Sequence, residues 1–147
     1  MGTPQLPEIG ASVGERVFEP TALQLFAFSA STWNGHRIHY DRDYAREQEG
    51  YPDILVQSHL HACFLAQTAQ AAFGRRARLT GIGWQNRGIA VPGDRLTVSG
   101  EVTSVSGTEG GTEVGLALEE RNQEDQLCVK GWVKVLLPPG WEPDERP

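Results

Sequence analysis

The sequence predicts an α+β fold in which a curved antiparallel sheet wraps around one long helix. Apolar residues recur at helical spacing in the first half of the chain, and the period changes to two after Gly74, as strands require. Residues 54–74 carry no Asp, Glu, Lys or Arg, and a helix that is apolar around most of its circumference is typical of one buried in a protein. A chain of 147 residues has the size of one domain, so we expect a single domain over residues 1–147.

The first helix is expected to begin after Thr21, whose hydroxyl can cap it. It should end near Asn34-Gly35, a pair that tolerates left-handed backbone, so residues 36–41 form a loop or turn at its C-terminus. Its apolar residues have the three-to-four spacing of one face: Leu23, Phe26, Ala27 and Ala30.

A short second helix is expected through residues 45–48, capped by Asp41 or Asp43 and ended by Gly50 and Pro52. The long helix follows over about residues 56–73 and is closed by Gly74. It contains too many Gln, Ser, Thr and His side chains for the hydrocarbon core of a membrane, so we expect it to be buried in protein.

The remaining elements are expected to be strands. The first runs over about residues 79–89, and later runs alternate apolar with small or polar side chains. Turn signals at residues 92–94, 107–111 and 122–125 separate these runs, which predicts a consecutive antiparallel meander. The apolar positions of the later runs are Leu96, Val98 and Gly100, then Val114, Leu116 and Leu118, then Leu127, Val129, Gly131, Val133, Val135 and Leu137.

Composition restricts the partners and the compartment. The formal net charge of -6 argues against a nucleic-acid partner, since no basic stripe is present to neutralise phosphates. Cys63 and Cys128 are isolated thiols without a signal peptide before them, so a reducing, cytoplasmic setting is expected. Residues 1–14 and 138–147 are rich in Pro with Gly or acidic residues, and we expect them to be extended or poorly ordered ends.

Candidate chemistry is concentrated in one part of the chain. The 4 histidines all lie within residues 36–61, and imidazole is the group most often used for acid/base chemistry at neutral pH. Residues 33–41 read W-N-G-H-R-I-H-Y-D, and Tyr44-Ala45, Glu49-Gly50-Tyr51-Pro52 and a long apolar helix follow. This run resembles the type 2 3-hydroxyacyl-thioester dehydratases, a branch of the MaoC-like hydratases. The resemblance implies the hotdog fold, which is also the layout that the periodicity predicts.

The resemblance also implies roles for the loop residues. The wider hydratase family has the signature G-D-x-N-P-[LI]-H, and placing His39 on its His puts Asn34 on its Asp and His36 on its Asn. An amide can hold a hydroxyl but cannot take its proton at neutral pH. We therefore expect His39 to be the acid/base and Asn34 to orient the water or hydroxyl. His36 is expected to line the site or to hydrogen-bond within the loop.

The start of the long helix is the second expected part of the site. Its backbone N–H groups are unpaired and point outward, so they suit the oxygen of a thioester. The family commonly reads H-G-P-L or H-G-M-L here, whereas this chain reads Gln57-Ser58-His59-Leu60. Ser58 in place of Gly implies either a tighter pocket or a displaced oxyanion donor.

The acyl chain is expected to lie along this helix, with Leu60 and Phe64 among the lining residues. His59 and His61 lie two residues apart on a helix and point nearly opposite ways, and His59 is favoured as the one that lines the pocket. No metal site is expected, because no carboxylate or thiol at ligand spacing completes His36-x-x-His39.

These expectations define the function that the sequence predicts: an (R)-type 3-hydroxyacyl-thioester dehydratase or enoyl-thioester hydratase. Its substrates would be acyl-CoA or acyl-carrier-protein thioesters, with no cofactor beyond the CoA or phosphopantetheine of the substrate. A single sheet leaves an edge strand uncovered, so a homodimer or a heteromer with another hotdog subunit is expected. Two alternatives stay open. One is a non-catalytic or half-competent subunit that completes the site of a MaoC-like partner, and the other is a hotdog thioesterase, for which the long helix offers no carboxylate.

Overall fold

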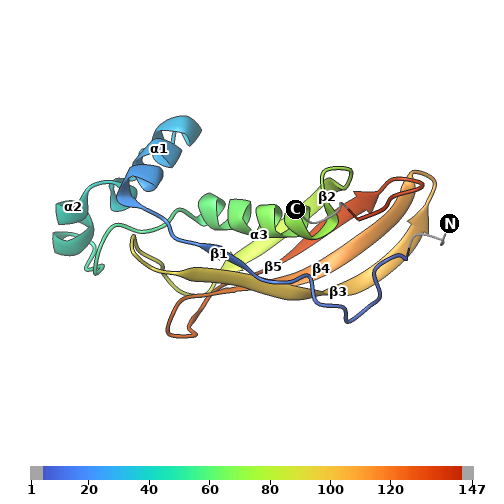
Figure 1. Ribbon diagram of the computed structural model, residues 1–147. Coiled ribbons are helices and arrows are strands. Elements are labelled where there is room, and N and C mark those ends of the chain that lie inside the picture. Colours follow the sequence, from blue (N-terminus) through green and yellow to red (C-terminus); the bar gives the residue numbers. More distant parts are fainter. Residues whose placement is uncertain (1–4, 144–147) are drawn as a thin grey trace.

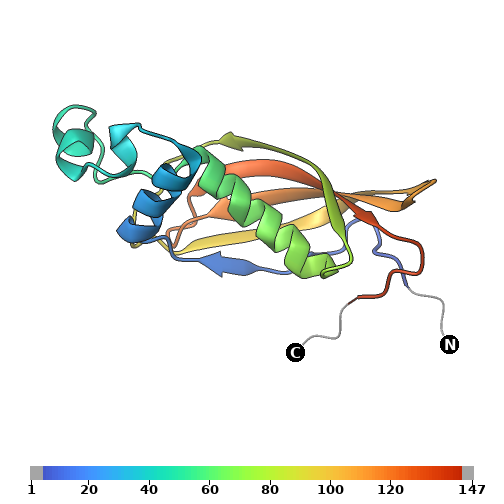
Figure 2. The same ribbon diagram turned by 90° about the horizontal axis from the view of Figure 1, so that it is seen from above.

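The computed structural model describes residues 5–143, which form one antiparallel sheet with a long helix across one of its faces (Figure 1). Seen from above, the helix crosses the strands diagonally (Figure 2). The elements are β1 (Arg16–Phe18), α1 (Ala22–Thr32), the 3-10 turn η1 (Arg37–His39), α2 (Arg42–Glu47), α3 (Ser58–Phe73), β2 (Arg78–Asn86), β3 (Leu96–Thr108), β4 (Gly111–Arg121) and β5 (Leu127–Leu137).

The strand order is β1-β3-β4-β5-β2, with all neighbours antiparallel. The meander predicted for the last three strands is confirmed. The position predicted for the strand at residues 79–89 is wrong, because β2 pairs with β5 rather than with β3, and Trp84 lies opposite Gly131. The place beside β3 is taken by β1, which the sequence analysis missed because a pairing of only three residues leaves no periodic pattern.

The core lies between α3 and the inner face of the sheet. Leu65 of α3 is fully buried, and it approaches the sheet at Gly131, where a Cβ would lie 2.8 Å from its Cδ1 atom. Gly131 therefore lets the helix lie close to the strands. The sheet residues of this core are the predicted inward positions Leu96, Val98, Val114, Leu116, Leu118, Val129, Val133, Val135 and Leu137.

One side of α3 is open, contrary to the expectation of a helix buried around most of its circumference. His59, Cys63, Gln67 and Ala71, each four residues after the last, are exposed. Within this chain the helix is covered by the sheet on one side only, so the stripe has no protein against it. Residues 5–143 contain no helix that is long and apolar enough to cross a membrane.

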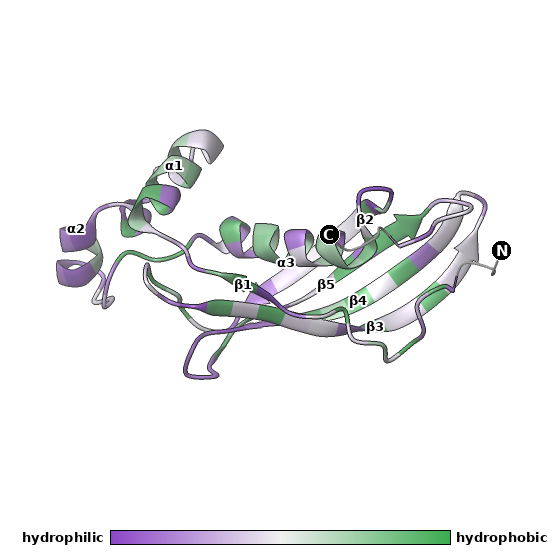
Figure 3. Ribbon diagram, in the orientation of Figure 1, coloured by the Kyte–Doolittle hydropathy of each residue, from purple (hydrophilic) through white to green (hydrophobic). Residues whose placement is uncertain are grey.

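α1 stands away from the sheet and carries hydrophobic residues (Figure 3), and its predicted apolar residues Leu23, Phe26, Ala27 and Ala30 are exposed. Its start is confirmed, since the Thr21 hydroxyl accepts a hydrogen bond from the Gln24 N–H. Its end differs from the prediction, because the left-handed residue is Trp33, with φ of 57°, and not Asn34 or Gly35. The contacts of α1 with the body run instead through its buried residues Leu25 and Ser29.

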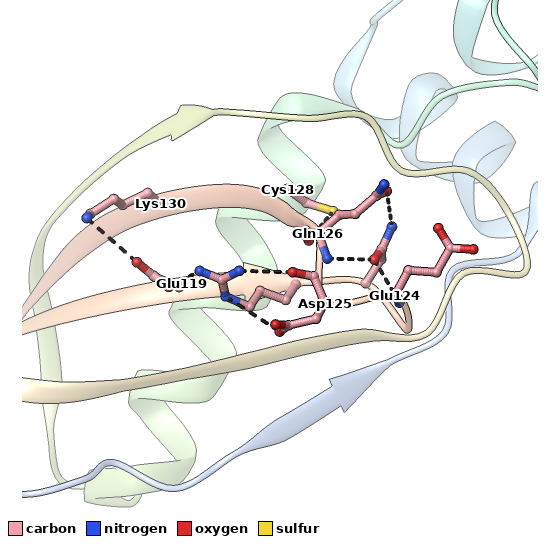
Figure 4. A network of polar contacts seen from close by, with 8 residues as sticks. Glu119, Glu124, Asp125, Gln126, Cys128 and Lys130 are labelled. Atoms are coloured by element: carbon pink, nitrogen blue, oxygen red, sulfur yellow. Dashed lines mark hydrogen bonds and ion pairs between the residues drawn. The ribbon is translucent and has the colours of Figure 1, made fainter.

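The β4–β5 turn is held by a cluster of polar side chains (Figure 4). Arg121 donates to the Asp125 carbonyl at 2.9 Å and to Glu119 at 3.0 Å, and Lys130 lies 3.6 Å from Glu119. Asp125 has φ of 61°, so it supplies the left-handed residue of this turn.

The described parts of both ends lie against the sheet and helix. Residues 5–14 run alongside β3, where Val13 donates its N–H to Gly100 and Val102 donates to Ala11. Trp141 is buried and donates its indole N–H to the Phe73 carbonyl at 2.9 Å. Residues 1–4 and 144–147, included in the expectation of extended or poorly ordered ends, lie outside the described residues.

Candidate functional site

His39 lies in the 3-10 turn between α1 and α2, with only 8% of its surface exposed. Its Nδ1–H donates to the Leu55 carbonyl at 2.8 Å, because a carbonyl oxygen can only accept. In the neutral ring Nε2 is then the nitrogen with the free lone pair. Burial lowers the pKa of His39, the Leu55 carbonyl opposes that shift, and the nearby His36 adds to it. His39 is therefore neutral at pH 7 and able to accept a proton at Nε2.

The turn that carries His39 is fixed by its own hydrogen bonds. The His36 Nδ1 accepts from the Ile38 N–H at 3.3 Å, and the Tyr40 hydroxyl donates to the Gly35 carbonyl at 2.9 Å. The Arg37 guanidinium binds Asp41 at 2.7 Å, while the other Asp41 oxygen caps α2 at Tyr44. Asp41 is thus the α2 cap, one of the two residues predicted for it.

A second set of bonds joins this turn to the start of α3. Leu55 accepts from the His39 ring and donates its own N–H to the Ile38 carbonyl at 2.8 Å. Because Leu55 precedes Ser58 by three residues, these two bonds fix the imidazole relative to the first turn of α3. The two parts of the site predicted from sequence are therefore neighbours in the structure.

Asn34 lines a small apolar pocket next to α1. Its Oδ1 accepts from the His36 N–H at 3.3 Å, which orients the side chain, and its own N–H is bonded to Ser29. The pocket has a volume of about 410 Å³. Its lining residues are Phe26, Ser29, Ala30, Trp33, Asn34, Gly35 and Tyr40. Apart from Asn34, this opening offers a ligand mainly apolar surface.

The start of α3 has free backbone donors. Gln57 occupies the N-cap position, but its side chain makes no capping bond; the Leu60 and His61 N–H groups bond to the Gln57 carbonyl, which leaves the Ser58 and His59 N–H groups for another acceptor. Instead, the buried Gln57 amide donates to the Leu25 carbonyl at 2.7 Å and to the Ser29 hydroxyl at 2.9 Å. Gln57 thus ties α3 to α1, and an uncapped helix start of this kind suits a developing oxyanion.

The Ser58 side chain faces β2. Its hydroxyl accepts from the Trp84 indole N–H at 2.9 Å and donates to the Asn86 amide oxygen at 3.3 Å. The sequence analysis missed Trp84 and Asn86 as neighbours of the site, because they lie more than twenty residues away in the chain. The only signal available was the unusual Ser58 itself, which needs hydrogen-bond partners where the family has Gly.

The remaining predicted side chains fall into two groups. His59 is exposed and packs edge-on against Trp84, with ring centroids 5.2 Å apart. Leu60 and Phe64 are buried in the core, where the Phe64 ring stacks on Phe18 at 4.3 Å. A ligand lying along this side of α3 would have to separate these two rings.

The part of the chain that the structure describes contains no group of three or more His, Cys, Asp or Glu side chains placed to hold a metal. The rings of His36 and His39 lie 6.0 Å apart at 65°, and a nitrogen of each is already used by the loop.

Comparison with known proteins adds an independent result. The sequence model of the family described as hydroxyacyl-thioester dehydratase type 2 matches residues 5–91, more than half of the chain. The chain belongs to this family. The matched stretch includes the His39 loop and all of α3, and the family predicted from residues 33–52 is thereby confirmed.

Two curated proteins are similar to this chain over part of its length. Mesaconyl-C(4)-CoA hydratase of Chloroflexus aurantiacus is 44% identical over 66 residues, which are 45% of this chain and 23% of that protein. The mitochondrial hydroxyacyl-thioester dehydratase type 2 of Saccharomyces cerevisiae is 29% identical over 90 residues, 61% of this chain and 31% of that protein. The chain therefore spans less than a third of the length of these relatives.

Solved structures share the fold of this chain. The (R)-hydratase of A. caviae superposes with a TM-score of 0.78 at 22% identity, covering 89% of this chain and 97% of that one. A chain of the ChsH1-ChsH2 complex of Mycobacterium tuberculosis gives 0.78 at 22% identity, covering 90% and 99%. The predicted hotdog fold is confirmed by this likeness and by the curved five-stranded sheet.

Proposed function

We propose that the chain is an (R)-type 3-hydroxyacyl-thioester dehydratase, working in reverse as an enoyl-thioester hydratase. The observation that carries this proposal is the His39 imidazole, neutral and with Nε2 free, tied through Leu55 to the uncapped start of α3. A base and an oxyanion site side by side are the two groups that this reaction requires.

In the direction of dehydration, His39 Nε2 takes the proton from C2 of the 3-hydroxyacyl thioester. The electron pair of that C–H bond moves towards the thioester carbonyl, whose oxygen is stabilised by the N–H groups at Ser58 and His59. The C2–C3 double bond then forms as the C3–O bond breaks, and the His39 proton leaves with the hydroxyl as water. The Asn34 amide would hold that hydroxyl, and hydration runs through the same steps in reverse. No cofactor beyond the CoA or phosphopantetheine of the substrate is required.

We propose two positions for the acyl chain. The predicted path along Leu60 and Phe64 would require the Phe64 and Phe18 rings to part. The pocket beside Asn34 is open, and its wall residue Ser29 is bonded to Gln57 at 2.9 Å, so it adjoins the helix start. We therefore propose that a short acyl group enters the pocket beside Asn34 and that longer ones extend towards Phe64.

The chain is proposed to work as a pair, either a homodimer or a heteromer with another hotdog subunit. β2 is an edge strand of nine residues, and an unpaired edge of that length is a template for another strand. The structures that share the fold include a two-protein complex. The free thiols of Cys63 and Cys128 fit a reducing compartment, for which we propose the cytoplasm.

The two alternatives give different experimental results. A half-competent subunit would show no turnover alone but full turnover with a MaoC-like partner. A thioesterase would need a carboxylate at the helix, and the one beside α3, Glu120, is fully buried and paired with His61. The geometry thus favours hydration over thioester hydrolysis.

The test is the rate at which the enoyl-thioester absorbance of a short enoyl-CoA is lost. His39→Ala should lower turnover by on the order of a hundredfold to ten-thousandfold, the usual value of a positioned proton carrier, with binding little changed. Asn34→Ala should lower turnover less, because it removes orientation but leaves the base. Asn34→Asp, which recreates the signature of the wider family, should remain active. A folded His39→Ala variant with wild-type turnover would disprove the mechanism.

A further inference from the structure

A pair of ionisable side chains lies between the first turn of α3 and the sheet, and neither belongs to the proposed catalytic site. His61, on the first turn of α3, and Glu120, near the end of β4, lie 2.6 Å apart from Nδ1 to Oε1, with 2% and 0% of their side chains exposed. Glu120 is in register with Val98 on one side and Val129 on the other, both buried. The carboxyl group therefore lies within the apolar core.

Burying two ionisable side chains in the core costs free energy that apolar side chains would not cost. Although His61 Nδ1 and Glu120 Oε1 lie close together, neither of these atoms nor the second Glu120 oxygen has a hydrogen-bond partner of regular geometry among the described residues. The neighbouring Cys128 thiol adds no charge, since burial, with a smaller effect of Glu120, raises its pKa to about 11. A buried ion pair of this kind is commonly no more stabilising than apolar side chains of the same volume. Stability of the core alone therefore does not account for the pair.

Its position suggests another role. His61 follows Gln57 by four residues and Ser58 by three, so all three belong to the turn whose free N–H groups face the proposed oxyanion. Each is anchored to a different element: Gln57 to α1, Ser58 to β2 and His61 to β4. The His61–Glu120 contact is the one of the three that ties this turn to β4, near the middle of the sheet.

We infer that His61 and Glu120 are positioning residues, which hold the first turn of α3 where its free N–H groups can reach the thioester oxygen. This inference rests on the proposed function, and it predicts a change in backbone motion that can be measured without substrate. In the double variant His61→Leu/Glu120→Leu the apolar pair should keep the fold, with a melting temperature equal to or above that of the wild type. The turn then loses its anchor to β4.

The decisive measurements on the double variant are amide exchange and kinetics. The Leu60 and His61-position amides, both bonded to the Gln57 carbonyl, should exchange about tenfold faster. Turnover of a short enoyl-CoA should fall by about tenfold to a hundredfold, the scale of a small misplacement, with KM little changed. Glu120→Gln, which keeps a polar side chain of the same length against His61, should leave both close to the wild type.

Thr68→Val is the matched control, since Thr68 is a buried polar residue of the same helix that bonds only to the Phe64 carbonyl, one turn back. It should leave exchange in the first turn and turnover unchanged. Unfolding of the double variant, or unchanged exchange in a folded one, would overturn the inference. So would a Glu120→Gln variant as impaired as the double variant. Inactivity of the wild type towards enoyl thioesters would instead count against the proposed function, and exchange would still decide the positioning role.

Discussion

At the scale of single residues, the surroundings of His39 decide what the site can do. Burial favours the neutral ring, and the Leu55 carbonyl selects the tautomer with Nε2 free. A histidine is a base only above its pKa, so a lowered pKa extends proton acceptance to more acidic solutions. The sequence alone predicts this histidine as the base, but it gives no sign of the Leu55 carbonyl that selects its tautomer.

His36→Asn should raise the pH below which kcat/KM falls in acidic solution. His36 helps to lower the pKa of His39, so its removal should raise that pKa and leave the base protonated over more of the acidic range. Asn can keep the bond that His36 accepts from the Ile38 N–H, so the turn should persist. The pH profile of kcat/KM measures the shift, with thermal melting as the control for folding. An acid limb at the wild-type position would show that His36 has no electrostatic effect on the base.

Ser58→Gly should separate the structural role of this side chain from access to the helix start. Loss of the hydroxyl leaves the Trp84 indole N–H without its acceptor, and we expect the free energy of unfolding to fall by about 1–2 kcal/mol. Turnover of bulky enoyl thioesters should be kept or raised. Ser58→Ala is the matched control, since it removes the same bond but keeps a Cβ. Loss of all activity in folded Ser58→Gly would mean that the hydroxyl takes part in the reaction.

At the scale of elements, the distance between α3 and the sheet is set by a missing side chain. A Cβ on Gly131 would lie 2.8 Å from Leu65 Cδ1 and 2.6 Å from the Gly83 carbonyl. Both contacts are too close for unmoved atoms, and the first concerns the helix whose start is the proposed oxyanion site.

Gly131→Ala should therefore force the helix and strands apart and lower the free energy of unfolding by about 1–3 kcal/mol. Gly107→Ala is the control within the sheet, because a Cβ there meets nothing within 4 Å and alanine is preferred over glycine in a strand. Urea denaturation of the two variants gives the comparison. Equal stability would show that the helix adapts without cost.

At the scale of the whole molecule, an apolar surface on α1 is left uncovered. Leu23 is 76% exposed, Phe26 58% and Trp33 93%. Trp33 also holds a left-handed backbone that is unfavourable for a residue with a Cβ. A large aromatic residue kept in a costly conformation at the surface supports a role in contacting another molecule.

We expect the chain to have twice the mass of one 16.1 kDa protomer in solution, or to acquire a partner of similar fold. Trp33→Gly should weaken this association without harming the protomer, because glycine suits the left-handed backbone. Light scattering over a range of protein concentrations measures the effect, and circular dichroism checks the fold. A fully structured and active monomer at micromolar concentration would rule out the pair.

The sequence by itself determined the features that depend on neighbours along the chain. Thr21 and Asp41 cap their helices through bonds to residues three positions later, and the period of two marks β3, β4 and β5. The family also follows from one continuous run, because residues 33–41 keep their order and spacing.

The tertiary structure decided the features that depend on distant segments. Only folding pairs β2 with β5, brings the Ser58 hydroxyl within hydrogen-bonding distance of Trp84, and places His61 against Glu120. The same is true of α1, whose apolar spacing was correct although its apolar face points outward. The physical reason is that periodicity reports which side of an element is apolar, whereas the partner of that side is chosen by packing between segments far apart in the chain.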